Sequence, residues 1–178
     1  LTNCVITENN GAGVNNYGNS GRTSPYLTNC IISGNNDDGI FNYSSNSGEA
    51  SPVLINCLIS GNKGNGISNQ GDSGQISPML YNCTVTANGE HGMMNSNNGA
   101  QCTPGLSNTI LWYNNAILSG DEVKNTDASP TFTYCDIQGS GGSGAWNSDF
   151  GIDEGNNIDT IPMFISVPDE STIPTDEG

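Results

Sequence analysis

The hydrophobic positions of this chain return at a fixed spacing. The pattern Leu-x-Asn-Cys-x-Ile opens at Leu1, returns at Leu27, Leu54 and Leu80, and appears in degenerate form at Leu106 and Phe132. The third position of the pattern, which is asparagine in the first five copies and tyrosine in the sixth, falls at 3, 29, 56, 82, 108 and 134. One repeat is therefore 26 or 27 residues long. Self-similarity at such a period predicts a solenoid, in which each repeat buries its apolar face against its neighbours.

The central asparagine of the pattern predicts a bend. Leu, Cys and Ile are expected to point inward, but Leu and Cys are three residues apart, and strict alternation along a strand requires an even spacing. Asparagine tolerates the left-handed backbone that such a bend needs. Stacked copies are then expected to bond to one another as an asparagine ladder. The ladder positions are Asn3, Asn29, Asn56, Asn82 and Asn108.

Three further positions recur in each repeat. An asparagine at 9, 35, 62, 88 and 114 indicates a second corner, and a Gly-apolar-x-Asn segment such as 39–42 indicates a short strand. A Ser-Pro or Thr-Pro pair precedes each new repeat, where proline suits the entry to a strand. One turn is thus expected to contain about three strands and three corners. The prediction is an all-β parallel β-helix of about six turns, and this arrangement resembles the right-handed parallel β-helix.

The repeat spacing divides the chain into three regions. Residues 1–135 are expected to form the β-helix turns, residues 136–166 an irregular cap, and residues 167–178 an acidic linker or tail. The cap is expected because a glycine-rich loop after Gly139 breaks the spacing. The chain begins inside a repeat without a preceding cap, so we expect it to be part of a longer protein.

Five of the six cysteines occupy one position of the repeat. Disulfides, a metal site and an inward stack of small apolar side chains are the alternatives. We favour the stack, because in-register side chains point the same way, no CxxC motif is present and the chain has one histidine. The stack comprises Cys4, Cys30, Cys57, Cys83 and Cys135. Cys102 lies off this position and is the candidate for a free thiol or a cross-link.

Composition removes several classes of partner. The net charge is −15, from 18 acidic and 3 basic residues. Binding to nucleic acid needs clustered Lys and Arg, so that partner is excluded, and so are anionic membrane surfaces. No apolar run approaches membrane-spanning length, and we expect no direct membrane insertion.

The C-terminal third carries a more specific resemblance. Residues 108–117 (NTILWYNNAI) are similar to the N-x-I-x-W-x-N-x-x-I opening of the choice-of-anchor Q domain. Residues 134–139 (YCDIQG) and 155–164 (GNNIDTIPMF) resemble its later strands, although one extra asparagine interrupts the last motif. The repeats themselves resemble extracellular parallel β-helix proteins of bacteria. These resemblances imply export and display at the cell surface, and they imply no reaction.

Candidate chemistry lies off the repeat. Asp38 and Glu90 occupy equivalent loops two turns apart, so a carboxylate pair of the kind used by glycoside hydrolases is conceivable, with a solvated loop as the alternative. Calcium is the most plausible ion, because hard oxygen ligands cluster near the cap. Its candidate ligands are Asp149, Asp153, Glu154 and Asp159. Asn42 and Thr160 lie in short motifs typical of N- and O-glycosylation.

These features favour a non-enzymatic role. The leading hypothesis is a structural or adhesive segment of a secreted or cell-surface bacterial protein, which acts as stalk, fibre or adhesin. The alternative is a polysaccharide-active enzyme or a carbohydrate-binding β-helix module. The expected partners are neighbouring domains, copies of the same protein or surface glycans. Self-assembly is a third hypothesis, because the turn at Leu1 offers unpaired strand edges.

Overall fold

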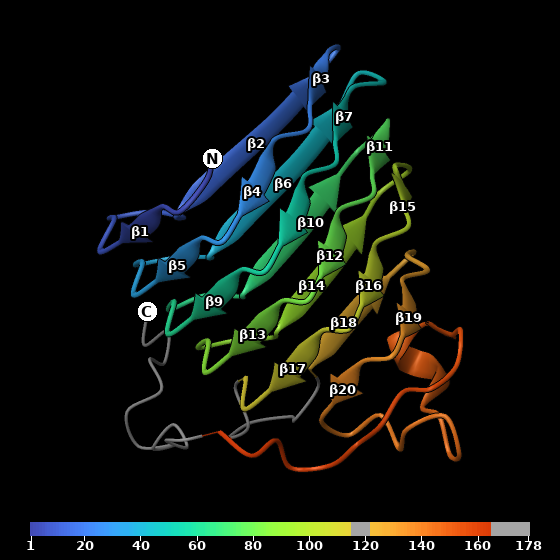
Figure 1. Cartoon of the computed structure of the whole chain (residues 1–178). Coiled ribbons are helices and arrows are strands. Elements are labelled where there is room, and N and C mark those ends of the chain that lie inside the picture. Colours follow the sequence, from blue (N-terminus) through green and yellow to red (C-terminus); the bar gives the residue numbers. More distant parts are fainter. Residues whose placement is uncertain (115–121, 165–178) are drawn as a thin grey trace.

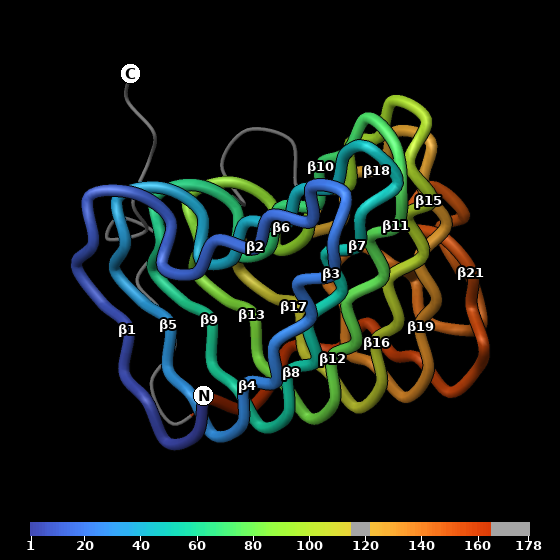
Figure 2. The backbone as a smooth tube through the Cα atoms, turned by 90° about the horizontal axis from the view of Figure 1, so that it is seen from above, coloured from blue at the N-terminus to red at the C-terminus, as the bar shows by residue number. Residues whose placement is uncertain are grey.

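The computed structural model describes residues 1–114 and 122–164. In this part of the chain every strand pairing is parallel, and the one helix is the short 3-10 segment η1 (Ser148–Phe150). Successive turns stack in chain order, and β1, β5, β9 and β13 lie side by side along the column (Figure 2). The predicted parallel β-helix is therefore confirmed. The acidic tail predicted at 167–178 lies outside the described residues.

The strands form four sheets, which are numbered in the order in which the chain visits them, and each of the first four turns contributes a strand to every sheet. Sheet 1 consists of β1 (Val5–Thr7), β5 (Ile31–Ser33), β9 (Leu58–Ser60), β13 (Thr84–Thr86), β17 (Ile110–Trp112) and β20 (Asp136–Ile137). Sheet 2 consists of β2 (Val14–Asn19), β6 (Ile40–Ser45), β10 (Ile67–Gly71), β14 (Met93–Asn97) and β18 (Val123–Thr126) (Figure 1). Sheet 3 consists of β3 (Arg22–Thr23), β7 (Glu49–Ala50), β11 (Gln75–Ile76) and β15 (Gln101–Cys102). Sheet 4 consists of β4 (Tyr26–Thr28), β8 (Val53–Ile55), β12 (Met79–Tyr81), β16 (Gly105–Ser107), β19 (Thr131–Thr133) and β21 (Ile152–Asp153).

The expectation of about three strands per turn was too low. The short strands of sheet 3 were not predicted, because two-residue strands such as β7 carry no hydrophobic period. The period itself is confirmed by the register, in which Val5 pairs with Ile31 and Ile31 pairs with Leu58. The bend is confirmed as well. Asn29, for example, has a φ of 53° and separates β4 from β5.

Inward side chains from the sheets form one continuous core. Leu27, Ile32, Ile40 and their equivalents in later turns are buried in a single apolar cluster. Four of the repeat cysteines belong to this cluster and Cys4 packs against it, while all six cysteines are free thiols. The cysteines therefore fill space in the column, as the packing interpretation expects.

The predicted ladder is present on the surface. The side-chain amide of Asn29 donates to Asn3 at 3.1 Å, that of Asn56 to Asn29 at 3.2 Å, and that of Asn82 to Asn56 at 3.3 Å. Asn108 has the same left-handed backbone, with a φ of 50°. All five of these side chains are solvent-exposed, so this ladder lies along an outer corner of the column.

Two further asparagine ladders run inside the column. One joins Asn9, Asn35, Asn62, Asn88 and Asn114 through side-chain bonds of 2.8–2.9 Å. The other joins Asn16, Asn42, Asn69, Asn95 and Asn125 through bonds of 2.7–2.8 Å. Most members are fully buried, so each amide depends on its neighbours for its hydrogen bonds. These ladders tie each turn to the next.

The C-terminal end closes around aromatic side chains. The ring of Trp146 lies 5.5 Å from that of Phe132, and its indole N–H donates to the Gly151 carbonyl at 2.9 Å. Phe150, at the end of η1, is buried in the core cluster. Strands β20 and β21 still pair with sheets 1 and 4, so the sheets continue into the region predicted as an irregular cap.

Candidate functional site

A polar groove lies beside the outward face of sheet 2. It has a volume of about 400 Å³, within the roughly 300–1,000 Å³ typical of small-ligand sites. Three stacked loops, which lead into β6, β10 and β14, provide most of its lining, and two side chains of sheet 2 complete it. The lining residues are Asn36, Asp37, Asp38, Lys63, Gly64, Asn65, Gln70, Glu90 and Met94.

A buried amide joins two carboxylates in this groove. The Asn65 side-chain Nδ2 donates to Asp38 Oδ1 at 3.0 Å and to Glu90 Oε2 at 2.7 Å. The two acceptor oxygens are therefore at most 5.7 Å apart, the sum of the two distances. The structure thus brings together the two acids that the sequence placed in equivalent loops. Their link through Asn65 was not predicted.

Burial changes the acidity of Asp38. Its side chain is 6% exposed, and desolvation raises the pKa of its carboxyl to about 6, although hydrogen bonds from Asn65 favour the charged form. The neighbouring charges of Asp37 and Glu90 raise this pKa further. Both donor bonds from Asn65 reach Oδ1, the second of them from the backbone N–H at 2.7 Å. Gly64 makes this approach possible, because a Cβ there would lie 2.7 Å from the same oxygen.

An aromatic cluster lies next to the groove on the same face of sheet 2. The ring of Tyr17 lies 5.7 Å from Phe41 and 6.0 Å from Tyr43, and the planes of Phe41 and Tyr43 are nearly parallel, at 6°. Tyr43 pairs in register with Gln70, which lines the groove. Asp72 accepts a 2.6 Å hydrogen bond from the Tyr43 hydroxyl and raises its pKa. Groove and cluster therefore form one continuous surface.

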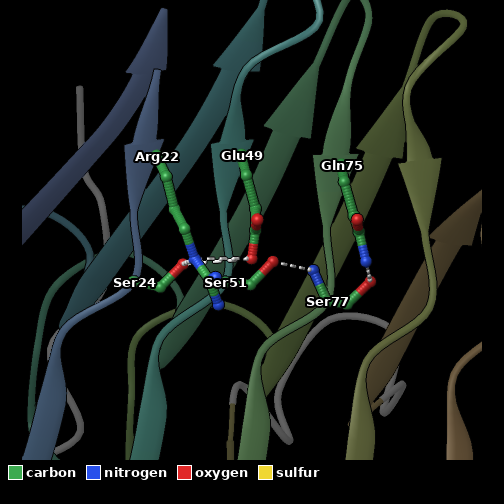
Figure 3. A network of polar contacts seen from close by, with 6 residues as sticks. All are labelled: Arg22, Ser24, Glu49, Ser51, Gln75 and Ser77. Atoms are coloured by element: carbon green, nitrogen blue, oxygen red, sulfur yellow. Dashed lines mark hydrogen bonds and ion pairs between the residues drawn. The ribbon is translucent and has the colours of Figure 1, made fainter.

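The polar network around sheet 3 differs from this groove. Arg22, Ser24 and Glu49 contact one another at 3.2–3.3 Å, and Ser51 and Ser77 continue the row in the next turns (Figure 3). The Arg22 side chain is 72% exposed, so its ion pair with Glu49 is a weak surface contact. This network stabilises the corner before sheet 4 and lines none of the three pockets described here.

The four candidate calcium ligands are not gathered into one site. Asp153 accepts hydrogen bonds from Ser143 and Asn157, and Asp159 accepts them from the backbone of Gly139 and Gly141. Within residues 1–114 and 122–164, no three His, Cys, Asp or Glu side chains form a group able to hold a metal ion. Asp149 and Glu154 are solvent-exposed. The carboxylates of Asp153 and Asp159 thus order loops of the cap.

Two modification candidates differ in accessibility. Asn42 is fully buried, and its amide accepts from Asn16 and donates to Asn69 within a ladder. The folded chain therefore does not present Asn42 as a glycosylation acceptor, contrary to the expectation from its motif. Thr160 is exposed and keeps the accessibility that its motif requires.

Cys102 is also less accessible than the sequence indicated. It is 3% exposed, and burial raises the pKa of its thiol to about 11. A thiol that is buried and protonated is a poor nucleophile and a poor partner for a cross-link.

Sequence reasoning also missed Glu122, which ends one of the buried ladders. Its carboxylate accepts from the Asn114 backbone at 3.0 Å and from the Asn114 amide at 2.6 Å. It is 1% exposed, and desolvation raises its pKa to about 8, even though the two bonds from Asn114 favour the charged form. Since Glu122 follows Asn114 by eight residues instead of 26 or 27, the repeat spacing gave no signal for this role.

Comparisons with family models, with curated proteins and with solved structures found no match for this chain. In the described part of the chain, no helix has the length and apolar character needed to cross a membrane. The groove and the aromatic cluster are therefore interpreted from their own chemistry.

Proposed function

We propose that this chain is a glycan-binding, adhesive β-helix segment of a secreted or cell-surface protein. The observation that carries the proposal is the surface on sheet 2, where the exposed ring of Tyr17 and the half-buried rings of Phe41 and Tyr43 adjoin a groove lined by carboxylates and amides. Aromatic faces pack against the apolar C–H faces of sugars, and amides and carboxylates bind their hydroxyl groups. The resemblance to surface-displayed β-helix proteins supports the same location.

The scaffold suits adhesion. Parallel strands follow one another about 4.8 Å apart, so side chains at one repeat position form straight rows along the column. On sheet 2 one such row contains Asn15, Phe41, Ser68, Met94 and Lys124. An extended polymer that lies along these rows contacts several turns at once, and multiple weak contacts add up to useful affinity. Stiffness comes from the buried ladders.

The test is a binding assay with one aromatic variant and a matched control. Tyr17 is 57% exposed within the cluster, and Tyr26 is 65% exposed on sheet 4, away from it. Loss of one stacking ring worth about 1 kcal/mol lowers affinity about fivefold. Tyr17→Ala should therefore weaken binding to soluble polysaccharides in affinity electrophoresis, whereas Tyr26→Ala should not. Absence of binding to any glycan, or equal loss in both variants, would refute the proposal.

The carboxylate pair favours a second candidate, hydrolysis of a glycosidic bond. Oxygens of Asp38 and Glu90 lie at most 5.7 Å apart, a limit that admits the roughly 5–5.5 Å of retaining glycosidases and excludes the roughly 6.5–9.5 Å of inverting ones. A carboxyl with a pKa of about 6 suits a general acid. New reducing ends from a neutral polysaccharide, lost in both Asp38→Asn and Glu90→Gln, would support this function. A chain that binds the polysaccharide and leaves its length unchanged would exclude it.

A further inference from the structure

We infer that the groove beside sheet 2 selects glycans that carry protonated amino groups, such as polymers of glucosamine. This inference rests on the proposed glycan-binding function and names its ligand class. It follows from the charges that line the groove, from the adjoining rings and from the field of the whole chain.

The groove contains more negative than positive groups. Asp37, Asp38 and Glu90 line it together with a single cation, Lys63. Asp37 and Lys63 are exposed, whereas Asp38 is buried and Glu90 is half-buried. The two inner carboxylates therefore lie in the part of the groove where water screens charge least, and an incoming ammonium group is attracted there.

The inner carboxylates share one side-chain hydrogen-bond donor. Both accept from one amide nitrogen, Nδ2 of Asn65, and the bonds to Asp38 all reach Oδ1. A carboxylate accepts at two oxygens, so Asp38 Oδ2 is left for a ligand. An ammonium group supplies three donors and a compensating charge, whereas an acetylated amino group supplies one donor and no charge, and an anionic sugar adds negative charge.

The aromatic cluster favours the same ligand class. The rings of Tyr17, Phe41 and Tyr43 gather next to the groove, and aromatic rings attract cations as well as sugar C–H groups. The whole chain carries a net charge of −15 with three basic residues, and this field repels uronates and sulfated glycans over longer distances. The charges of the groove and the net charge of the chain thus both favour a positively charged glycan.

The test compares four oligosaccharides of equal length: β-1,4-linked glucosamine, N-acetylglucosamine and glucose, and α-1,4-linked galacturonate. Binding to the intact chain is measured by calorimetry near pH 7, above the pKa of about 6 of the Asp38 carboxyl, so that this group is ionised while part of the amine groups stays protonated. Glucosamine oligomers should bind at least about fivefold more tightly than the neutral ones at low salt, and the preference should shrink in about 0.5 M salt. Galacturonate should bind most weakly.

Variants that remove one negative charge show which residues cause the preference for glucosamine oligomers. Asp37→Asn and Glu90→Gln keep side-chain size and should reduce the ratio of glucosamine affinity to glucose affinity. Glu154→Gln is the matched control, because Glu154 is exposed and does not line the groove. Equal binding of glucosamine and neutral oligomers, a preference for galacturonate, or an unchanged preference in both groove variants would overturn the inference. Those results leave the glycan-binding proposal standing, whereas that proposal fails if no glycan binds or if Tyr17→Ala and Tyr26→Ala lose binding equally.

Discussion

Removal of one buried ladder amide should cost far more stability than removal of an exposed one. The Asn62 side chain accepts from the Asn35 backbone at 3.1 Å and from the Asn35 amide at 2.8 Å. It donates to Asn88 at 2.9 Å and to the Ile32 carbonyl at 3.2 Å. Asn62→Ala deletes all four bonds and leaves buried donors on Asn35 without their acceptor. At about 1 kcal/mol per bond, with a further penalty for unsatisfied donors, the loss should be about 3–5 kcal/mol.

The matched control is Asn56 in the exposed ladder. Its amide bonds to Asn29 and Asn82 are 3.2 and 3.3 Å long and face solvent, so water replaces them when the side chain is removed. The remaining cost arises from the left-handed backbone, with a φ of 54°, which alanine adopts at about 1 kcal/mol. Asn56→Gly should be nearly neutral, because glycine adopts this conformation freely.

Urea unfolding at equilibrium measures both effects. Far-UV circular dichroism and tryptophan fluorescence should be followed together, because turns of a solenoid can unfold separately, and coincident transitions are needed for one free energy of unfolding. A loss below about 1 kcal/mol in Asn62→Ala would refute the role assigned to the buried ladder. Equal losses in Asn62→Ala and Asn56→Ala would refute it too.

Three further predictions concern titration, thiols and the glycine beside Asp38. Because the pKa of Glu122 is raised to about 8 in the folded chain, its contribution to stability should be present at low pH and be lost as pH rises toward 8. Unfolding free energies of Glu122→Gln should lack this decline. Mass spectrometry after brief alkylation should find Cys4 modified first and Cys102 protected until unfolding, because Cys4 is half-buried and Cys102 is buried. Gly64→Ala should displace Asp38 and lower its pKa toward the ordinary value, measured by NMR titration, and an unchanged pKa would contradict the packing seen.

The repeat pattern was sufficient to predict the architecture, because each turn repeats the same packing problem. The position of Asn29 predicted a left-handed bend, and its φ is 53°. The apolar positions predicted one continuous core, since Leu and Ile of each turn meet only their copies in adjacent turns. Here local backbone preference and burial favour the same structure, so the sequence alone predicts it.

Burial of polar side chains was harder to predict. The sequence placed Asn35 at a corner and Asn42 in a glycosylation motif, and both features are typical of the surface. Both side chains are nevertheless fully buried in ladders. An isolated asparagine is costly to bury, and the cost disappears only when copies in neighbouring turns satisfy each amide. That compensation depends on the register between turns. The two-residue strands of sheet 3, which also pair in this register, are too short to show a hydrophobic period in the sequence.

The repeat spacing predicted which loops form the candidate site, but it did not predict the contacts within the site. Asp38 and Glu90 lie in equivalent loops two turns apart, so their proximity followed from the spacing. Asn65 aligns with Asp38 in the loop between them, but nothing in its own repeat showed that its amide would contact both carboxylates. The raised pKa of Asp38 depends on desolvation by the surrounding loops, and the close approach at Gly64 is a property of the folded backbone.

The ladders also explain how one scaffold accommodates a specific groove. Asn35 and Asn88 hold their turns in place from inside the column, whereas Asp37 and Glu90 project from loops that follow those positions directly. Substitution of a loop carboxylate by its amide removes charge without removing a ladder bond. We therefore expect groove variants such as Glu90→Gln to keep the unfolding free energy of the parent chain while they change ligand preference. The residues that hold the turns together and the residues that select a ligand are different side chains, so ligand chemistry can change without loss of the fold.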